Sequence, residues 1–88
     1  MHHASHPDII KRLKRADGHL QKIIRMIEAD SPCLDVAQQL QAVYAAIGNA
    51  KRVFVQDHIE GCLDEQVLHD TANTKQKLAE FKEIAKYL

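Results

Sequence analysis

The feature that most constrains the fold is a stretch of about 30 residues, from Cys33 to about Cys62, that no proline interrupts. Apolar residues recur along it at helical spacing: Leu34, Ala37, Leu40, Val43, Tyr44, Ile47, Ala50 and Phe54. This period predicts one amphipathic helix, which at about 1.5 Å per residue would be about 45 Å long. Such a helix is long for a chain of 88 residues. Small helical chains of this kind often complete their core by forming oligomers.

Shorter helices are expected on either side of this stretch. Pro7 suits a first helical turn, and a stripe of apolar residues predicts a helix from there to near Ala29. Ser31 and Pro32 then suit the cap and first position of the central helix. A third helix is predicted over residues 73–87. With no strand alternation, the sequence predicts an all-α, three-helix single domain over residues 1–88, with a flexible histidine-containing N-terminus at residues 1–6.

The charge is distributed unevenly along the chain. Residues 1–27 carry six Lys and Arg against two Asp, whereas residues 28–88 carry six against ten acidic residues. The first region concentrates its cations at Lys11, Arg12, Lys14 and Arg15, and Lys51 with Arg52 forms a second cluster. Clustered cations of this kind can contact the phosphates of DNA. A basic residue taken by itself is more often simply part of the solvent-exposed face of a helix.

Several classes of protein are not expected. No apolar run approaches the ~18 residues that span a membrane, and no secretion signal opens the sequence. Two cysteines without such a signal predict reduced thiols in the cytoplasm. No pair of carboxylates and no nucleophile with an adjacent base can be recognised, so an enzyme is not expected.

A histidine and the two cysteines suggest a metal site. His58 and Cys62 are four residues apart and therefore lie on one face of a helix. Cys33 lies 25 residues before His58, which corresponds to about 37 Å along a straight helix. One chain therefore cannot close a site from these three residues unless the helix breaks.

Two chains can close the site. If two central helices pack antiparallel about a two-fold axis, Cys33 of one chain meets His58 and Cys62 of the other, and the helices cross near residues 46–47. The small residues of the sequence Ala45-Ala46-Ile47-Gly48 are consistent with close packing there. The donors suit Cu(I) in a trigonal site, Zn(II) with a fourth ligand, or Ni(II) with an added nitrogen. His2, His3 or His6 can supply that nitrogen.

Three features of the sequence resemble the CsoR/RcnR family of copper-sensing and nickel-sensing repressors. They are the spacing of Cys33, His58 and Cys62, the stretch IKRLKRADGHLQKI at residues 10–23, and CLDVAQQLQAVYAAIGNA at residues 33–50. The resemblance covers most of residues 7–65.

The resemblance implies a fold, a ligand set and a function. It implies three-helix chains that form an antiparallel dimer and then a disc-like homotetramer, with Cu(I) held by Cys33, His58 and Cys62 between chains. For Ni(II) or Co(II), an N-terminal histidine completes the site, and His3 can take that place with a shift in register. Operator DNA is expected to contact Lys11, Arg12, Lys14, Arg15 and Arg52.

The function expected from these observations is a metal-responsive transcriptional repressor. Without metal it would bind operator DNA, and it would release the DNA when Cu(I) binds. A repressor that responds to Ni(II) or Co(II) is one alternative. A metal-storage or metal-delivery protein without specific DNA binding is another, of a different class.

Overall fold

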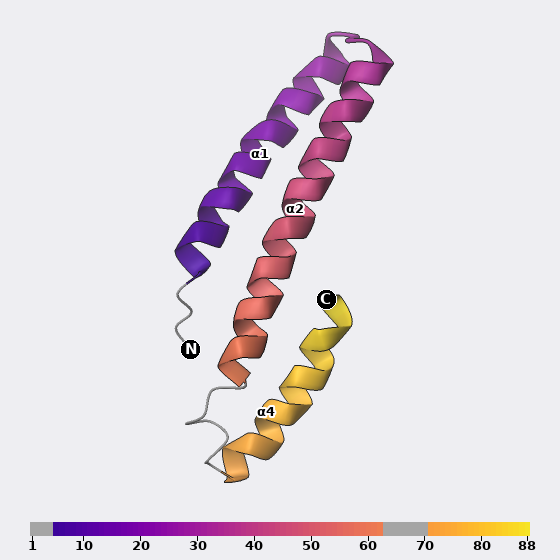
Figure 1. The fold of residues 1–88 in the computed structure, drawn as a ribbon. Helices are drawn as coiled ribbons and strands as arrows, with labels where there is room; N and C mark the ends of the chain where they lie inside the picture. Colours follow the sequence, from indigo (N-terminus) through magenta and orange to yellow (C-terminus); the bar gives the residue numbers. More distant parts are fainter. Residues whose placement is uncertain (1–4, 63–70) are drawn as a thin grey trace. The chain divides into compact units, whose positions relative to one another are not determined.

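The described residues form three α-helices and no strand. A computed structural model describes residues 5–62 and 71–88, without the side chains of residue 62 and residues 71–73. Helix α1 spans His6–Glu28, α2 spans Cys33–Cys62, α4 spans Thr71–Ile84, and a short 3-10 helix, η1, spans Ala85–Tyr87 (Figure 1). The prediction of an all-α chain with three helices and a long central one is confirmed.

The chain divides into two compact units, which are described separately. The first, called here the α1–α2 unit, comprises residues 7–51, and the second, called the α4 unit, comprises residues 1–6 and 52–88. Helix α2 contributes to both units and is a continuous helix of 30 residues, as its proline-free sequence predicts. None of the described helices has an apolar stretch long enough to cross a membrane.

The α1–α2 unit is an antiparallel helix pair (Figure 1), and the buried residues between its helices recur at a seven-residue spacing. On α1 the buried residues are Ile9, Ala16 and Ile23. On α2 the partly buried Val36 is followed at the same spacing by buried Val43 and Ala50. A seven-residue repeat keeps one narrow stripe of each helix facing its neighbour. The core of this unit is therefore a seam of small and β-branched side chains.

The turn between α1 and α2 is closed by two backbone hydrogen bonds. The Ser31 amide donates to the Met26 carbonyl at 2.9 Å, and the Asp30 amide donates to the Ile27 carbonyl at 3.1 Å. This bond pattern is a Schellman motif, which requires a left-handed residue after the helix. Asp30 takes that conformation with φ of 55°, so a position that usually favours glycine is occupied by an aspartate.

Helix α2 begins one residue later than the sequence predicts. The Val36 amide donates to the Pro32 carbonyl at 3.1 Å, which gives Pro32 the place of the N-cap, and Cys33 is the first helical residue. Asp35 lies in the first turn, where a negative charge is stabilised by the helix dipole. The one-residue difference leaves Cys33 in the first turn, as predicted.

Much of the predicted apolar stripe stays exposed in the single chain. On α1, Ile24 and Ile27 are 50% and 56% exposed, and on α2, Leu34 and Tyr44 are 68% and 75% exposed. The seam between α1 and α2 therefore covers only part of the apolar surface that the two helices carry. Apolar side chains that stay exposed on a small protein are typical of surfaces that bind another molecule.

Candidate metal centre and nucleic-acid surface

The three predicted metal ligands all lie on α2. Cys33 is its first residue and carries an exposed free thiol, whereas His58 is partly buried near its C-terminal end. Cys62 is the last residue of α2, and its side chain lies outside the part of the structure that is described. Because α2 is continuous, Cys33 and Cys62 are at opposite ends of the same helix.

The donor types fit a soft or borderline metal ion, but the described part of one chain does not assemble a site. Thiolate and imidazole ligands suit Cu(I), Zn(II) or Ni(II). Among the side chains that the structure describes, no group of three or more His, Cys, Asp or Glu is placed to hold a metal. The chemistry of the predicted ligands is therefore suitable, and a site made from them needs groups beyond those described in a single chain.

His58 faces a hollow within the α4 unit. The hollow has a volume of about 440 Å³ and is lined by His58 together with Gln76, Ala79, Glu80, Glu83, Ile84 and Tyr87. Its two carboxylates each form an ion pair with a lysine of the same segment. Lys77 Nζ lies 3.3 Å from Glu80 Oε2, and Lys86 Nζ lies 3.2 Å from Glu83 Oε2. The Lys77 side chain is only 14% exposed, so the Glu80 pair is the better shielded from solvent.

An aromatic stack within the same unit joins His6, the first residue of α1, to Phe54 of α2. The rings of His6 and Phe54 have centroids 5.2 Å apart and planes 11° apart. Phe54 is one helical turn before His58, so the two share a face of α2. His6, the last residue of the N-terminus that the sequence predicts to be flexible, is half-buried here and begins α1. His3 lies outside the described residues.

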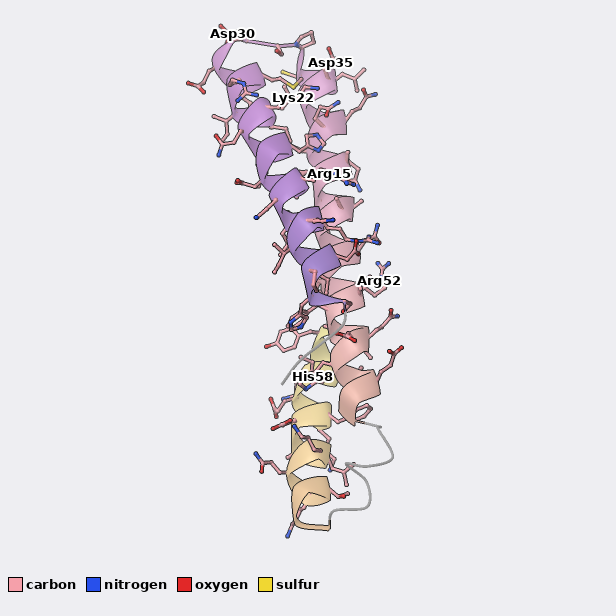
Figure 2. The ribbon with its side chains drawn as sticks, turned by 90° about the vertical axis from the view of Figure 1, so that its left-hand side faces the viewer. Arg15, Lys22, Asp30, Asp35, Arg52 and His58 are labelled. Carbon is pink, nitrogen blue, oxygen red and sulfur yellow. The ribbon has the colours of Figure 1, made fainter. Side chains whose placement is uncertain are left out.

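The predicted DNA contacts are exposed but belong to different units. Lys11, Arg12, Lys14 and Arg15 are exposed along α1, and Arg52 is exposed on α2 in the α4 unit. Figure 2 labels Arg15 and Arg52. Arg12 donates from Nε to Asp8 Oδ2 at 2.8 Å, one turn away. Since both side chains are largely exposed, this ion pair contributes little to stability.

Two of these arginines line a small pocket between α1 and α2, called here the Arg15 pocket. It has a volume of about 200 Å³ and is lined by Arg12, Arg15, Ala16, His19, Ala46 and Asn49. His19 is held by Gln39 across the helix pair, with 2.6 Å between Nε2 and Oε1. Lys11 and Lys14 are not among the lining residues.

Sequence reasoning missed His19, Gln39 and Asn49 as candidates. Part of the signal is visible in the sequence, because Arg12, Arg15 and His19 recur at a spacing that places them on one helix face. The α2 partners could not be found in this way, since their proximity depends on how α1 and α2 are aligned.

A protein-family model described as "Metal-sensitive transcriptional repressor" matches residues 5–87. The chain belongs to this family. Its helical fold agrees with a solved structure titled "The nickel-responsive transcriptional regulator InrS", with a TM-score of 0.80 and 29% sequence identity over 100% of this chain and 98% of that one. The resemblance of the sequence to the CsoR/RcnR family is thereby confirmed.

Copper-sensing repressors are also similar in sequence. The copper-sensing transcriptional repressor CsoR of Mycobacterium ulcerans is 48% identical over 59 residues, which cover 67% of this chain and 50% of that protein. The copper-sensing transcriptional repressor RicR of Mycobacterium tuberculosis is 36% identical over 70 residues, which cover 80% of this chain and 73% of that protein. The match to the mycobacterial CsoR thus spans about half of its length.

Proposed function

We propose that this chain is a metal-responsive transcriptional repressor that binds operator DNA without metal and releases it when Cu(I) binds. The observation that carries the proposal is the family match over residues 5–87. Relatives described as copper-sensing repressors support Cu(I) as the effector. Cys33, His58 and Cys62 are the donors that we assign to the ion, and two thiolates with one imidazole suit Cu(I).

We infer that each site joins two chains. Cys33 and Cys62 begin and end one continuous helix, so the ligands can meet only if a second chain brings its Cys33 to the His58 end of the first. An antiparallel dimer does this and produces two identical sites. The exposed apolar side chains of α1 and α2 supply a surface for such a partner, and pairing of dimers gives the proposed tetramer.

Metal binding and DNA binding then weaken each other, because each favours a different arrangement of the chains in the assembly. A metal ion would connect the start of α2 in one chain to its end in the other. If this arrangement moves the basic side chains of α1 and Arg52 out of register with the DNA phosphates, metal weakens DNA binding. Because the coupling is reciprocal, DNA must weaken metal binding by the same factor.

A response to Ni(II) or Co(II) is the second candidate. It is supported by the likeness to the nickel-responsive regulator over the whole of this chain. The His6–Phe54 stack also favours it, because it holds the start of α1 on the face of α2 that carries His58. His3, three residues before His6, is the nitrogen donor that we assign to this alternative site.

To test the proposal, DNA duplexes that bind the metal-free protein are first enriched from a randomised library. Binding of one labelled duplex is then measured by fluorescence anisotropy. Cu(I) is titrated anaerobically, with Ni(II) and Co(II) in parallel. Release near one Cu(I) per chain supports the proposal, and release by Ni(II) or Co(II) alone supports the second candidate. Metal binding without any specific DNA binding would instead indicate storage or delivery.

The Cys33→Ala variant provides the sharpest control. We expect it to bind the same duplex with unchanged affinity and to lose metal-dependent release, because Cys33 is exposed and supports no described core contact. Loss of DNA binding in this variant would show that the cysteine has a structural role and would count against the proposed site.

A further inference from the structure

We propose that Phe54 determines which metal ion the site prefers, because its ring stacks on the ring of His6. The stack holds the chain that carries His2 and His3 within reach of His58. It thereby raises the affinity for Ni(II) and Co(II), which need an added nitrogen ligand, and leaves the affinity for Cu(I) unchanged. This inference rests on the assignment of His58 to the metal in the proposed function, and it makes Phe54 a positioning residue rather than a ligand.

The stack is a nearly parallel contact between two aromatic rings. Its ring centroids are 5.2 Å apart and its planes differ by 11°, which is the offset arrangement that aromatic pairs favour. Both rings belong to the α4 unit, so the contact does not depend on how the two units are arranged. His6 is half-buried there, as expected of a ring whose face is covered by another ring.

The helix start next to the stack lacks the usual side-chain cap. Ser5 directly precedes α1 and therefore has the place of its N-cap. Its hydroxyl is buried and has no hydrogen-bond partner among the described residues, so it does not supply the bond that commonly closes the start of a helix. Helix ends without such a bond fray. The ring of Phe54 therefore provides a holding contact at a point where the capping contact is missing.

The stacked His6 is close enough to the metal end of α2 for the preceding residues to reach it. Phe54 and His58 share a helix face and are about 6 Å apart along the axis. His3 is three residues before His6, a span of at most ~11 Å. Without the stack, the next well-buried residue along the chain is Ile9, which doubles the length of chain between His3 and its anchor. Doubling a flexible tether lowers the effective concentration of the tethered group about threefold.

The candidate metal ions should respond differently to the stack. Cu(I) is satisfied in a trigonal site by two thiolates and one imidazole, whereas Ni(II) needs a further donor to complete a square-planar site. A histidine from the first residues of the chain therefore adds to the affinity for Ni(II) and Co(II) only. Loss of the stack should change the selectivity of the site, whereas a general loosening of the fold would weaken the binding of all three ions.

The first arm of the test uses the metal-free protein. We expect the ring protons of His6, recorded by ¹H NMR, to be displaced by the ring current of Phe54. The displacement should disappear in Phe54→Leu, which keeps an apolar side chain without a ring, and it should remain in Phe54→Tyr. His6 signals that are the same in both variants would overturn the stack.

The second arm measures the affinities of the protein for Ni(II), Co(II) and Cu(I) by competition with chelators, without DNA. We expect Phe54→Leu to lower the Ni(II) and Co(II) affinities about three- to tenfold and to leave the Cu(I) affinity within about twofold. Phe54→Tyr and His6→Phe are the matched controls and should keep the Ni(II) affinity, because each retains two rings. A loss in His6→Phe without a loss in Phe54→Leu would make His6 a ligand and would overturn the proposal.

A double variant, His2→Ala with His3→Ala, tests whether the stack acts through these histidines. In that background Phe54→Leu should have no further effect on the Ni(II) affinity, since the group that the stack positions is absent. An equal loss in both backgrounds, or a loss of the same size for Cu(I), would overturn the proposal and make Phe54 a packing residue. Helical circular dichroism checks that each variant is folded.

The outcomes separate this proposal from the repressor proposal. A Ni(II) affinity that falls in Phe54→Leu, in a protein that Cu(I) does not release from DNA, would support the stack and overturn Cu(I) as the effector. Release of DNA by Cu(I), with a Ni(II) affinity that Phe54→Leu leaves unchanged, would overturn the stack and leave the repressor proposal intact. Failure of the wild-type protein to bind any of the three ions would overturn both.

Discussion

At the scale of single residues, Asp30 has a backbone conformation that is unfavourable for an aspartate. It is the left-handed residue of the Schellman motif, with φ of 55°, and its negative charge lies at the C-terminal end of α1, where the helix dipole disfavours an anion. Aspartate tolerates this conformation better than most residues but less well than glycine. The two closing hydrogen bonds involve only the backbone, so they do not depend on the side chain.

We therefore expect Asp30→Gly to raise the free energy of unfolding by about 0.5 kcal/mol, because relief of backbone strain outweighs the added freedom of the unfolded chain. Asp30→Ala should lower it, since alanine keeps a Cβ and tolerates the left-handed region less well than aspartate. Urea unfolding at one fixed protein concentration measures both. A decrease in both variants would show that the carboxylate makes a stabilising contact of its own.

At the scale of the helices, the seam between α1 and α2 depends on a few well-buried side chains. Ile23 is 2% exposed and packs in a cluster with Ala16 and Val43. We expect Ile23→Ala to lower the free energy of unfolding by about 2–4 kcal/mol, from lost burial and from the cavity that remains. Denaturant unfolding with circular dichroism as the readout measures the loss.

The adjacent Ile24 is the matched control for this prediction. It is 50% exposed in the single chain, so in protein diluted to the monomer the same substitution removes less buried area and should cost about half as much or less. A loss at Ile24 that equals the loss at Ile23 in the monomer would contradict the burial seen in the single chain, whereas a loss that grows with protein concentration would indicate that a second chain covers this face.

Helix types and bounds were largely predictable from the sequence because they depend on local signals. The absence of proline between Cys33 and Cys62, and the apolar periods on either side, correctly predict three helices.

Burial was less predictable. The periodic stripe includes Leu34 and Tyr44, which are exposed in one chain, because periodicity shows which face is apolar and not what covers it. The Arg15 pocket was not predicted, since Asn49 meets α1 only through the alignment of two helices.

At the scale of the whole molecule, Gly48 tests where two chains meet. A Cβ built at Gly48 has no neighbouring atom within 4 Å among the described residues of the chain, so none of these residues requires a glycine there. The proposed antiparallel dimer places its helix crossing next to this residue, near residues 46–47. A small residue at a crossing permits close approach of two helix backbones, and a large one prevents it.

We expect Gly48→Leu to shift the protein towards monomers, with a rise of about tenfold or more in the dissociation constant, because a bulky side chain overpacks the crossing. Sedimentation equilibrium measures this. Gly18→Leu on α1 is the control, because a Cβ at Gly18 also has no neighbour within 4 Å in the part of the chain that the structure describes. Unchanged assembly in Gly48→Leu, together with disruption in Gly18→Leu, would place the interface on α1 instead.

If each metal site is shared between two chains, as we propose, two variants that are inactive alone should complement each other. Cys33→Ala and Cys62→Ala should each fail to hold Cu(I) tightly as homodimers. In a mixed dimer, however, Cys33 of one chain meets His58 and Cys62 of the other, so one of the two sites is intact. Random reassortment after joint refolding should therefore restore about one quarter of the wild-type capacity for Cu(I).

Metal content after passage over a competing Cu(I) chelator measures this recovery. Differently tagged chains that co-purify verify that mixed dimers have formed, and each variant refolded alone sets the background. If mixed dimers form and the capacity stays at that background, the ligands must come from a single chain. The continuous α2 helix could not then persist in the metal-bound protein, because Cys33 and Cys62 lie at its opposite ends. Recovery near one quarter would instead require that the start of one α2 meets the end of another.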